Sequence, residues 1–262
     1  MQLQISRPTS NSPWVIWGGL LPSGSLKHLT FDNYLKGLGS HELERGLIEI
    51  SEGCTALALQ YFAERAGVQL LVLCSPAGEA QLRSRGYRGE TLVPRSVEEA
   101  LEICASRQRD GWHWPEQMSN PKLLRAARAW VPDVARLLRS RSEIDTVCCG
   151  FGTGASVTAL TDELAPLGYR VIGIEAPRGG SIPGWRNYSE HNLGERDLFH
   201  SHRGRVELRP AQVPSGARVT PLEILLSHDF GTEPSRVCVV SHDGVPPDLS
   251  GLARQVGPDL PR

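Results

Sequence analysis

The sequence has neither a long apolar run nor an excess of charge of one sign. No stretch approaches the roughly 20 apolar residues that a membrane span needs. The 28 basic and 29 acidic residues leave a formal net charge of −1, which gives no basic surface for nucleic acid. The opening segment, MQLQISRPTSNSPW, lacks a charged stretch followed by an apolar block, so we expect no secretion signal. These absences favour a cytoplasmic protein that binds neither membranes nor nucleic acid.

The six cysteines include no C-x-x-C pair. Most of them lie in apolar runs such as LLVLC and TVCCG, so we predict buried free thiols in a reducing compartment rather than disulfides or a zinc site. His200 and His202 form an H-S-H pair, but no third ligand follows at a suitable spacing. We therefore expect no metal.

Strand-length apolar runs alternate with helical patterns along a chain that can bury a substantial core. Strands are predicted at 68–74, 90–93, 145–150, 169–176 and 235–241, and helices at 55–67, 96–107, 122–138 and 156–168. Pro132 should kink or divide the third helix, and Gly67 and Gly168 fall where helices commonly end. Such alternation predicts an α/β fold whose mostly parallel sheet is covered on both faces. Residues 177–219, rich in Gly, Pro, Ser, Arg and His, are expected to form a long loop.

A glycine-rich turn joins a predicted strand to a predicted helix. It reads G-F-G-T-G-A-S at 150–156, and a second strand follows the helix. Glycines at such a turn let backbone N–H groups approach an anion, and the helix N-terminus adds partial positive charge. Thr153 and Ser156 can add hydroxyl donors. The turn therefore predicts a site for a phosphate or a similar group.

Several ligands fit this turn. A dinucleotide prefers G-x-G-x-x-G, whereas the spacing here is G-x-G-x-G. An S-adenosylmethionine-dependent methyltransferase is an alternative, because Glu175 ends the next strand. Against it, Cys148 stands where that family usually carries an acidic residue, and the turn comes halfway along the chain. A tight turn that binds nothing is a further interpretation.

The order of five segments favours another ligand, pyridoxal 5′-phosphate. In chain order the segments are PSGSLKH (22–28), IEISEGCTALAL (48–59), EQMSNP (116–121), GFGTGAS (150–156) and VVSHDG (239–244). This order resembles the fold-type II pyridoxal-phosphate enzymes, the cysteine synthase and tryptophan synthase β-chain superfamily, over roughly residues 15–176. The resemblance implies a tryptophan synthase β-like α/β fold of two interleaved lobes. Residues 1–36 and 136–262 would form the larger, cofactor-binding lobe, and 37–135 the smaller one.

The resemblance assigns a covalent role to Lys27, which on its motif alone would be read as a surface lysine at a helix start. As the Schiff-base lysine it needs a neutral amine, and burial lowers a lysine pKa in that direction. The residues that map onto the phosphate loop are Gly152, Thr153, Gly154, Ala155 and Ser156.

Residues of the smaller lobe map onto the loop that holds a substrate carboxylate. Ser51, Gly53 and Thr55 open a predicted helix, and Gln117 falls where the family often places a carboxylate-binding glutamine. Ser241 falls where tryptophan synthase-like members place a hydroxyl that faces the pyridine nitrogen.

Three residues of the smaller lobe depart from the pattern or carry a second role. Cys54 stands where the family has asparagine or glutamine beside the cofactor ring, and a thiol is a weaker donor than an amide. It is either a cofactor contact with its own chemistry or a small buried hydrophobe. Glu52 would repel a substrate carboxylate unless it points to solvent, pairs with a cation or acts as an acid or base. Glu49 aligns with the acid/base glutamate of tryptophan synthase and is a catalytic candidate beside Lys27 and Glu52.

The resemblance thus implies pyridoxal-phosphate-dependent β-replacement or β-elimination on a serine- or cysteine-derived amino acid, cysteine synthase-like, in amino-acid biosynthesis. Such an enzyme is a lyase or a transferase and is expected to be a homodimer. A carrier or partner protein is a further expectation. Besides the methyltransferase, the alternative is a degenerate pyridoxal-phosphate fold that binds a partner.

Overall fold

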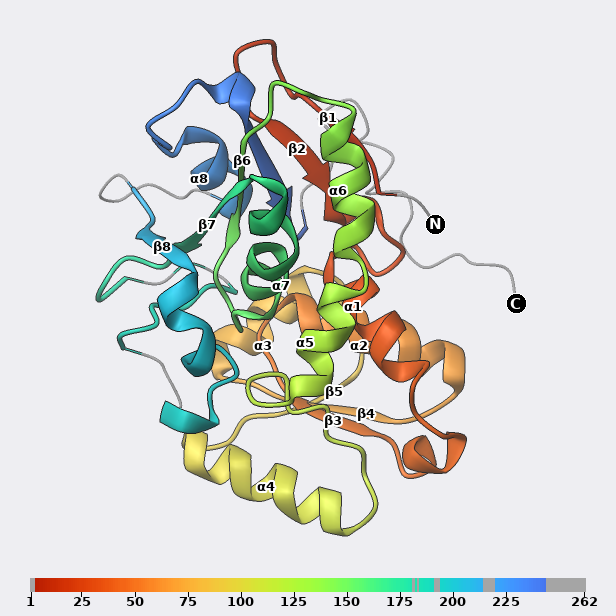
Figure 1. Ribbon diagram of the computed structural model, residues 1–262. Coiled ribbons are helices and arrows are strands. Elements are labelled where there is room, and N and C mark those ends of the chain that lie inside the picture. The colour runs from red at the N-terminus through yellow and green to blue at the C-terminus, as the bar shows by residue number, and fades with distance from the viewer. Residues whose placement is uncertain (1–2, 181, 183, 191–193, 214–219, 244–262) are drawn as a thin grey trace.

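Two sheets of mostly parallel strands organise the protein (Figure 1). The computed structural model describes residues 3–180, 182, 184–190, 194–213 and 220–243. The larger sheet has the order β1-β2-β9-β6-β7-β8, and only the β1–β2 pair is antiparallel. Its strands are β1 (Ile5–Ser6), β2 (Trp14–Trp17), β6 (Thr146–Gly150), β7 (Arg170–Glu175), β8 (Glu207–Pro210) and β9 (Val237–Ser241). The smaller sheet is fully parallel and consists of β3 (Leu47–Ile50), β4 (Leu70–Leu73) and β5 (Glu90–Leu92).

Helices connect and cover these strands (Figure 1). They are α1 (Lys27–Leu35), α2 (Cys54–Ala66), α3 (Pro76–Ser84), α4 (Val97–Arg109), α5 (Pro121–Arg128), α6 (Val131–Arg139), α7 (Ala155–Leu164) and α8 (Pro221–Ser227). Within the described parts of the chain, no helix is long and apolar enough to cross a membrane.

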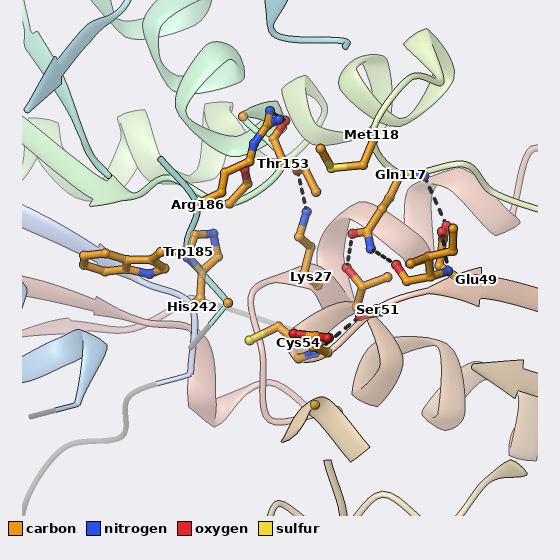
Figure 2. A pocket seen from close by; sticks show the side chains of 18 of the residues that line it. Lys27, Glu49, Ser51, Cys54, Gln117, Met118, Thr153, Trp185, Arg186 and His242 are labelled. Carbon is orange, nitrogen blue, oxygen red and sulfur yellow. Dashed lines mark hydrogen bonds between the residues drawn. The ribbon is translucent and has the colours of Figure 1, made fainter. Parts of the chain in front are cut away.

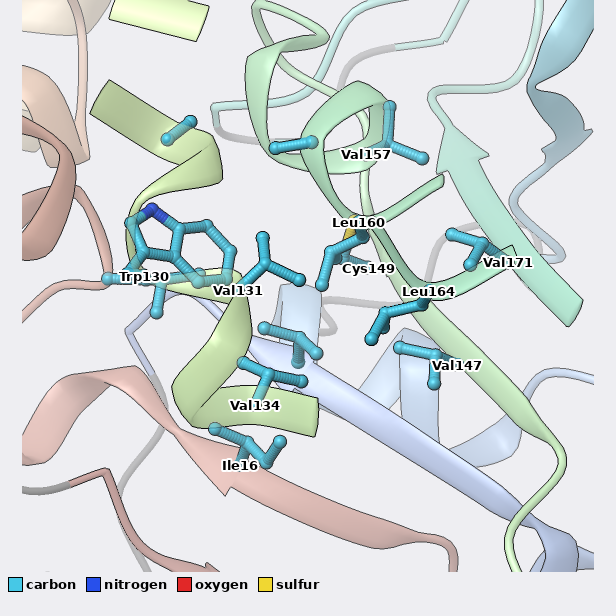
Figure 3. Packing of buried hydrophobic residues seen from close by; sticks show 14 of the residues in the cluster. Ile16, Trp130, Val131, Val134, Val147, Cys149, Val157, Leu160, Leu164 and Val171 are labelled. Atoms are coloured by element: carbon cyan, nitrogen blue, oxygen red, sulfur yellow. The ribbon is translucent and has the colours of Figure 1, made fainter. Parts of the chain in front are cut away.

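Strands of the larger sheet send alternate side chains to opposite faces, as the two-residue period of a strand requires. On β6, Val147 and Cys149 belong to the cluster that α6 and α7 cover, whereas Cys148 belongs to the cluster on the α8 side. Figure 3 shows the first of these clusters, in which Leu160 and Leu164 of α7 are fully buried. Burial of each such side chain contributes about 1.5–3 kcal/mol to stability. The predicted coverage of both faces is confirmed.

The helix boundaries follow the local chemistry of the chain. Gly67 takes a left-handed conformation with φ of 66° and ends α2, and Gly168, with φ of 91°, ends the short 3-10 turn after α7. Pro132 lies at the start of α6, so the segment predicted as one helix is divided into α5 and α6. All six thiols are free, five of them buried, as predicted, while Cys54 is half-buried.

The structure contains elements that the sequence patterns did not predict. Residues 177–219 were expected to be a loop, but the described part contains β8 as well as two 3-10 turns, Gly194–Arg196 and His200–Arg205. β8 is an edge strand with half-buried, charged residues, so its sequence lacks the apolar signal of the inner strands. The short helices α3 and α8, each with proline in its first turn, carried too few residues for a helical period to be seen.

Candidate active site

A cavity of about 1160 Å³ lies where the carboxyl ends of strands from the two sheets face each other (Figure 2). Its lining comes from the segments that follow β2, β3, β6 and β9, and from α4 and α8. Open α/β sheets commonly bind ligands at this edge. All the predicted site residues except Ala155 line the cavity. They are Lys27, Glu49, Ser51, Glu52, Gly53, Cys54, Thr55, Gln117, Gly152, Thr153, Gly154, Ser156 and Ser241. Ala155 is buried behind them in α7.

Lys27 is the first residue of α1, and its half-buried side chain lines this cavity. The turn before it is held by Ser25, whose hydroxyl accepts the Lys27 backbone N–H at 3.1 Å, and by Leu26, whose N–H donates to the His242 carbonyl at 2.7 Å. The ammonium nitrogen donates to the Thr153 hydroxyl at 3.2 Å. Burial lowers the pKa of Lys27, with the neighbouring Cys54 and Glu49 opposing the shift. An amine so placed loses its proton more readily than a surface lysine.

The glycine turn presents unpaired backbone donors to the same cavity. Among the described residues, the N–H groups of Gly152, Thr153, Gly154 and Ser156 have no hydrogen-bond partner, and all four residues line the cavity. Gly154 has φ of 87° and caps α7 without a side-chain bond. Orphan N–H groups at a helix N-terminus, with a hydroxyl and a lysine beside them, suit a phosphate group. The residues present therefore fit pyridoxal phosphate at this end of the cavity.

The N-terminus of α2 forms the opposite wall. The Ser51 hydroxyl accepts the N–H groups of Gly53 at 3.4 Å and of Ala56 at 3.2 Å, so its own proton is free to be donated. The Thr55 hydroxyl donates to the Gln117 side-chain oxygen at 2.6 Å, and the Gln117 amide donates to the Ile50 carbonyl at 2.7 Å. Gln117 therefore fixes Thr55 and the end of β3 together.

Glu49 is almost fully buried on β3, and three donors hold its carboxylate. The backbone N–H of Ile50 donates to it at 2.9 Å, that of Gln117 at 3.1 Å and the Trp114 indole at 3.3 Å. Burial outweighs these bonds and raises the pKa of Glu49 to about 7. A carboxyl group with this pKa can accept and release a proton near neutral pH.

Glu52 and Cys54, the two departures from the family pattern, have different surroundings. The Glu52 carboxylate is exposed at the cavity wall and accepts the backbone N–H of Ser75 at 3.0 Å. The Cys54 thiol lies 3.5 Å from the Arg85 guanidinium, and Arg85 pairs with Asp243 at 3.0 Å. This contact joins the start of α2 to the segment that follows β9, two residues beyond its last residue, Ser241.

His242 is a cavity residue that was not predicted. It follows Ser241 at the carboxyl end of β9, and its Nε2 lies 3.2 Å from the Ser156 hydroxyl. Burial, with Lys27 adding repulsion, lowers the pKa of His242 to about 4, so the ring is neutral at physiological pH. In the sequence, the segment VVSHDG indicates a role for Ser241 only. Nothing in the sequence predicts that the imidazole of His242 lies beside the glycine turn.

Glu175, the residue on which the methyltransferase alternative depends, is already engaged. Its carboxylate accepts the backbone N–H of Tyr188 at 2.8 Å. Glu175 also does not line the cavity beside the glycine turn. The structure thus lends that alternative no support.

Comparison with known proteins adds a family and a fold. The family model described as pyridoxal-phosphate dependent enzyme matches residues 18–198. A comparison with curated proteins finds no match. Among solved structures, O-ureido-L-serine synthase has 18% identity and a TM-score of 0.65, over 98% of this chain and 94% of its own. A hydrogen sulfide-producing enzyme from Fusobacterium nucleatum has 14% identity and a TM-score of 0.66, over 91% of each chain. Maize serine racemase has 14% identity and a TM-score of 0.67, over 97% of this chain and 91% of its own.

These likenesses show the fold, and they confirm the predicted α/β architecture of the tryptophan synthase β-like type with mostly parallel sheets. The matched range holds the lysine segment, the start of α2, the Gln117 segment and the glycine turn, but ends before Ser241 and His242.

Proposed function

The chain belongs to the family of pyridoxal-phosphate dependent enzymes, and on that premise we propose that it catalyses β-replacement or β-elimination on a serine- or cysteine-derived amino acid. The observation that supports this most directly is the 3.2 Å contact between the Lys27 amine and Thr153 of a turn with unpaired backbone donors. One end of the cavity thus offers a nucleophilic amine and a phosphate cradle together.

The residues of the glycine turn would hold the cofactor phosphate through their free N–H groups, with the hydroxyls of Thr153 and Ser156 as additional donors. When bound, pyridoxal phosphate supplies an electron sink that stabilises negative charge at the substrate α-carbon. Ser241 would present its hydroxyl, a neutral partner, to the ring nitrogen, which suits β-elimination and replacement. Cys54 would lie beside the ring and bring the neighbouring Arg85 charge with it.

Lys27 would act first as the amine that binds the cofactor and then as the base that takes the substrate α-proton. Both tasks need an unprotonated nitrogen, and burial in the cavity favours that form. The turn from Ser25 to Lys27 is tied to the His242 backbone, so the direction of the side chain is set before any ligand binds.

The start of α2 would receive the substrate carboxylate. Ser51 keeps a hydroxyl proton to donate, and among the described residues the N–H groups of Cys54 and Thr55 have no partner. Gln117 would orient Thr55 through the bond between them. Gly53 precedes the helix and lets its backbone approach the ligand.

Two carboxyl groups are proposed to take part in proton transfer. Glu49, with a pKa of about 7, would exchange a proton inside the cavity near neutral pH. Glu52 would act at the exposed side, where its bond to the Ser75 backbone keeps it away from the carboxylate position.

We further propose the larger organisation of the enzyme. Residues 1–36 and 136–262 form the cofactor-binding lobe, and 37–135 the lobe that carries the substrate loop. The enzyme is a cytoplasmic homodimer of a biosynthetic pathway, where a small amino-acid substrate reaches it free or on a carrier or partner protein.

The reaction can be tested with an O-acylated serine and a thiol. Elimination should release pyruvate and ammonia, and replacement should give the thioether amino acid, detected by mass spectrometry. The Lys27→Ala variant serves as the inactive control. If the cofactor-loaded protein only racemises serine, or transforms neither substrate, the proposed reaction is wrong.

A further inference from the structure

We propose that Arg186, held by Asp197, is a positioning residue that sets the backbone of the glycine turn for the phosphate of the cofactor. This inference rests on the proposed binding of pyridoxal phosphate at that turn. It assigns a role to the segment after β7, which lies outside all the sequence motifs.

Arg186 binds three consecutive carbonyl groups of the turn. Its backbone N–H donates to the Phe151 carbonyl at 2.9 Å, its Nε to the Gly152 carbonyl at 2.6 Å and its Nη2 to the Thr153 carbonyl at 3.2 Å. One residue thus binds the carbonyl oxygens of three successive residues, 151–153.

The carbonyl bonds of Arg186 also set the direction of the backbone N–H groups of the turn. In a trans peptide the carbonyl of one residue and the N–H of the next point in opposite directions. Fixing the carbonyls of Phe151, Gly152 and Thr153 toward Arg186 therefore points the N–H groups of residues 152–154 away from it. Those N–H groups are the ones without partners, in residues that line the cavity.

Asp197 holds the guanidinium in place. Its carboxylate pairs with both terminal nitrogens of Arg186, one of them at 2.9 Å, and accepts the Phe199 N–H at 3.0 Å. The two side chains are 10% and 0% exposed. The guanidinium also lies 5.0 Å from the centre of the Phe151 ring. Burying such an ion pair costs desolvation energy. The planar guanidinium of Arg186 also makes several hydrogen bonds in fixed directions, which a lysine ammonium would not reproduce.

The same segment also explains the glycines of the turn. A Cβ at Gly150 would lie 2.1 Å from the Trp185 indole, one at Gly152 2.7 Å from the Gly184 carbonyl and one at Gly154 2.8 Å from Phe199. Each glycine is needed because residues next to Arg186 or to Asp197 in the chain pack against the back of the turn. Figure 2 shows Arg186 beside Thr153 and Trp185 at the edge of the cavity.

The test compares two ligands that differ only by the phosphate. The full-length, cofactor-free protein is titrated with pyridoxal 5′-phosphate and with pyridoxal, and binding is followed by absorbance and intrinsic fluorescence. In Arg186→Gln we expect the affinity for pyridoxal 5′-phosphate to fall at least about tenfold, because charge-assisted hydrogen bonds that shape its site are lost. The affinity for pyridoxal should change less than about twofold.

Two variants complete the test. Arg186→Lys keeps the charge without the fork and should restore only part of the phosphate preference. Arg128→Gln is the matched control, because Arg128 pairs with Asp162 on α7 but does not touch the turn. It should leave both affinities unchanged. If Arg186→Gln does not fold, Asp197→Asn should reduce the phosphate preference in the same direction.

Four outcomes would overturn the inference. Equal losses for the two ligands would mean that Arg186 only supports the fold, and an unchanged preference in every Arg186 and Asp197 variant would mean that the turn is set without it. Full restoration by Arg186→Lys would remove the role of the fork. If the wild type itself does not prefer the phosphorylated ligand, the proposed cofactor site fails as well, which separates the two hypotheses.

Discussion

Replacing His242 with glutamine should make the protein less sensitive to acid. His242 lies in the cavity wall beside Lys27 and Asp243. Burial is the main cause that lowers its pKa from the usual 6.5 to about 4, and repulsion by Lys27 adds to this shift, whereas Asp243 opposes it. The unfolded chain therefore takes up a proton at a pH where the folded protein does not. Above pH 6.5 the contribution of His242 to the free energy of unfolding does not depend on pH. As the pH falls from 6.5 toward 4, the folded protein loses stability.

The linkage relation gives the size of the effect. With pKa values of 6.5 unfolded and about 4 folded, the wild type should lose about 2 kcal/mol between pH 7.5 and pH 5 because of this ring alone. The glutamine amide can still bond to Ser156 but does not titrate. We expect the difference in free energy of unfolding between variant and wild type to shift by about 2 kcal/mol in favour of the variant over that range.

Urea unfolding of the cofactor-free protein at the two pH values measures this quantity. Other titrating groups are common to both proteins and cancel in the difference. The Lys36→Gln variant, which removes an exposed charge that is paired with Asp32 on the surface, is a control for net charge. An unchanged difference between the two pH values would refute the reasoning, since it would mean that the imidazole is solvated and not repelled by Lys27.

Three further changes give distinct results. In Glu49→Gln the pH effect should have the opposite sign. Burial raises the pKa of Glu49 from 4.5 to about 7, so the wild type loses stability as the pH rises. In the same unfolding assay the variant should gain about 2 kcal/mol of unfolding free energy relative to wild type from pH 5 to 7.5. A flat difference would contradict the burial of a protonated Glu49. Gly154→Ala should destabilise the folded protein by about 1–3 kcal/mol through φ strain, and the contact of the new Cβ with Phe199 should add a packing cost. Gly168→Ala is the control, because Gly168 has a similar φ but open space around it, so thermal unfolding should show the strain alone. Equal losses would remove the packing argument. Cys54, the half-buried thiol, should react first with a thiol reagent and be protected by pyridoxal phosphate, and unprotected labelling would place it outside the site.

Much of the fold could be predicted because buried parallel strands carry a local signal. The runs around Val72, Val147 and Val239 are apolar on both faces, so composition and length were sufficient. The edge strand at Glu207–Pro210 and the helix at Pro221–Ser227 lacked that signal, since one is half-exposed and the other has seven residues.

The candidate site was predictable only where function follows a motif along the chain. The segments of Lys27, Ser51 and Gly152 could be found in order, and the structure brings them into one cavity. Arg186 and His242 could not be found, because their roles arise from contacts between residues far apart in sequence. The glycines illustrate the difference: they were interpreted as room for an anion, and the structure adds that Trp185 and Phe199 occupy the space behind them.

The central claim is that Lys27 binds the aldehyde carbon and the glycine turn the phosphate of one and the same pyridoxal phosphate molecule. The sequence contains three lysines, and Lys36 and Lys122 are exposed. The protein should be loaded with the cofactor, reduced with borohydride and mapped by peptide mass spectrometry. We expect the pyridoxyl group on Lys27, and loss of both this label and the visible absorbance band in Lys27→Ala but not in Lys36→Ala. A label on Lys36 or Lys122, or a band that persists in Lys27→Ala, would contradict the claim.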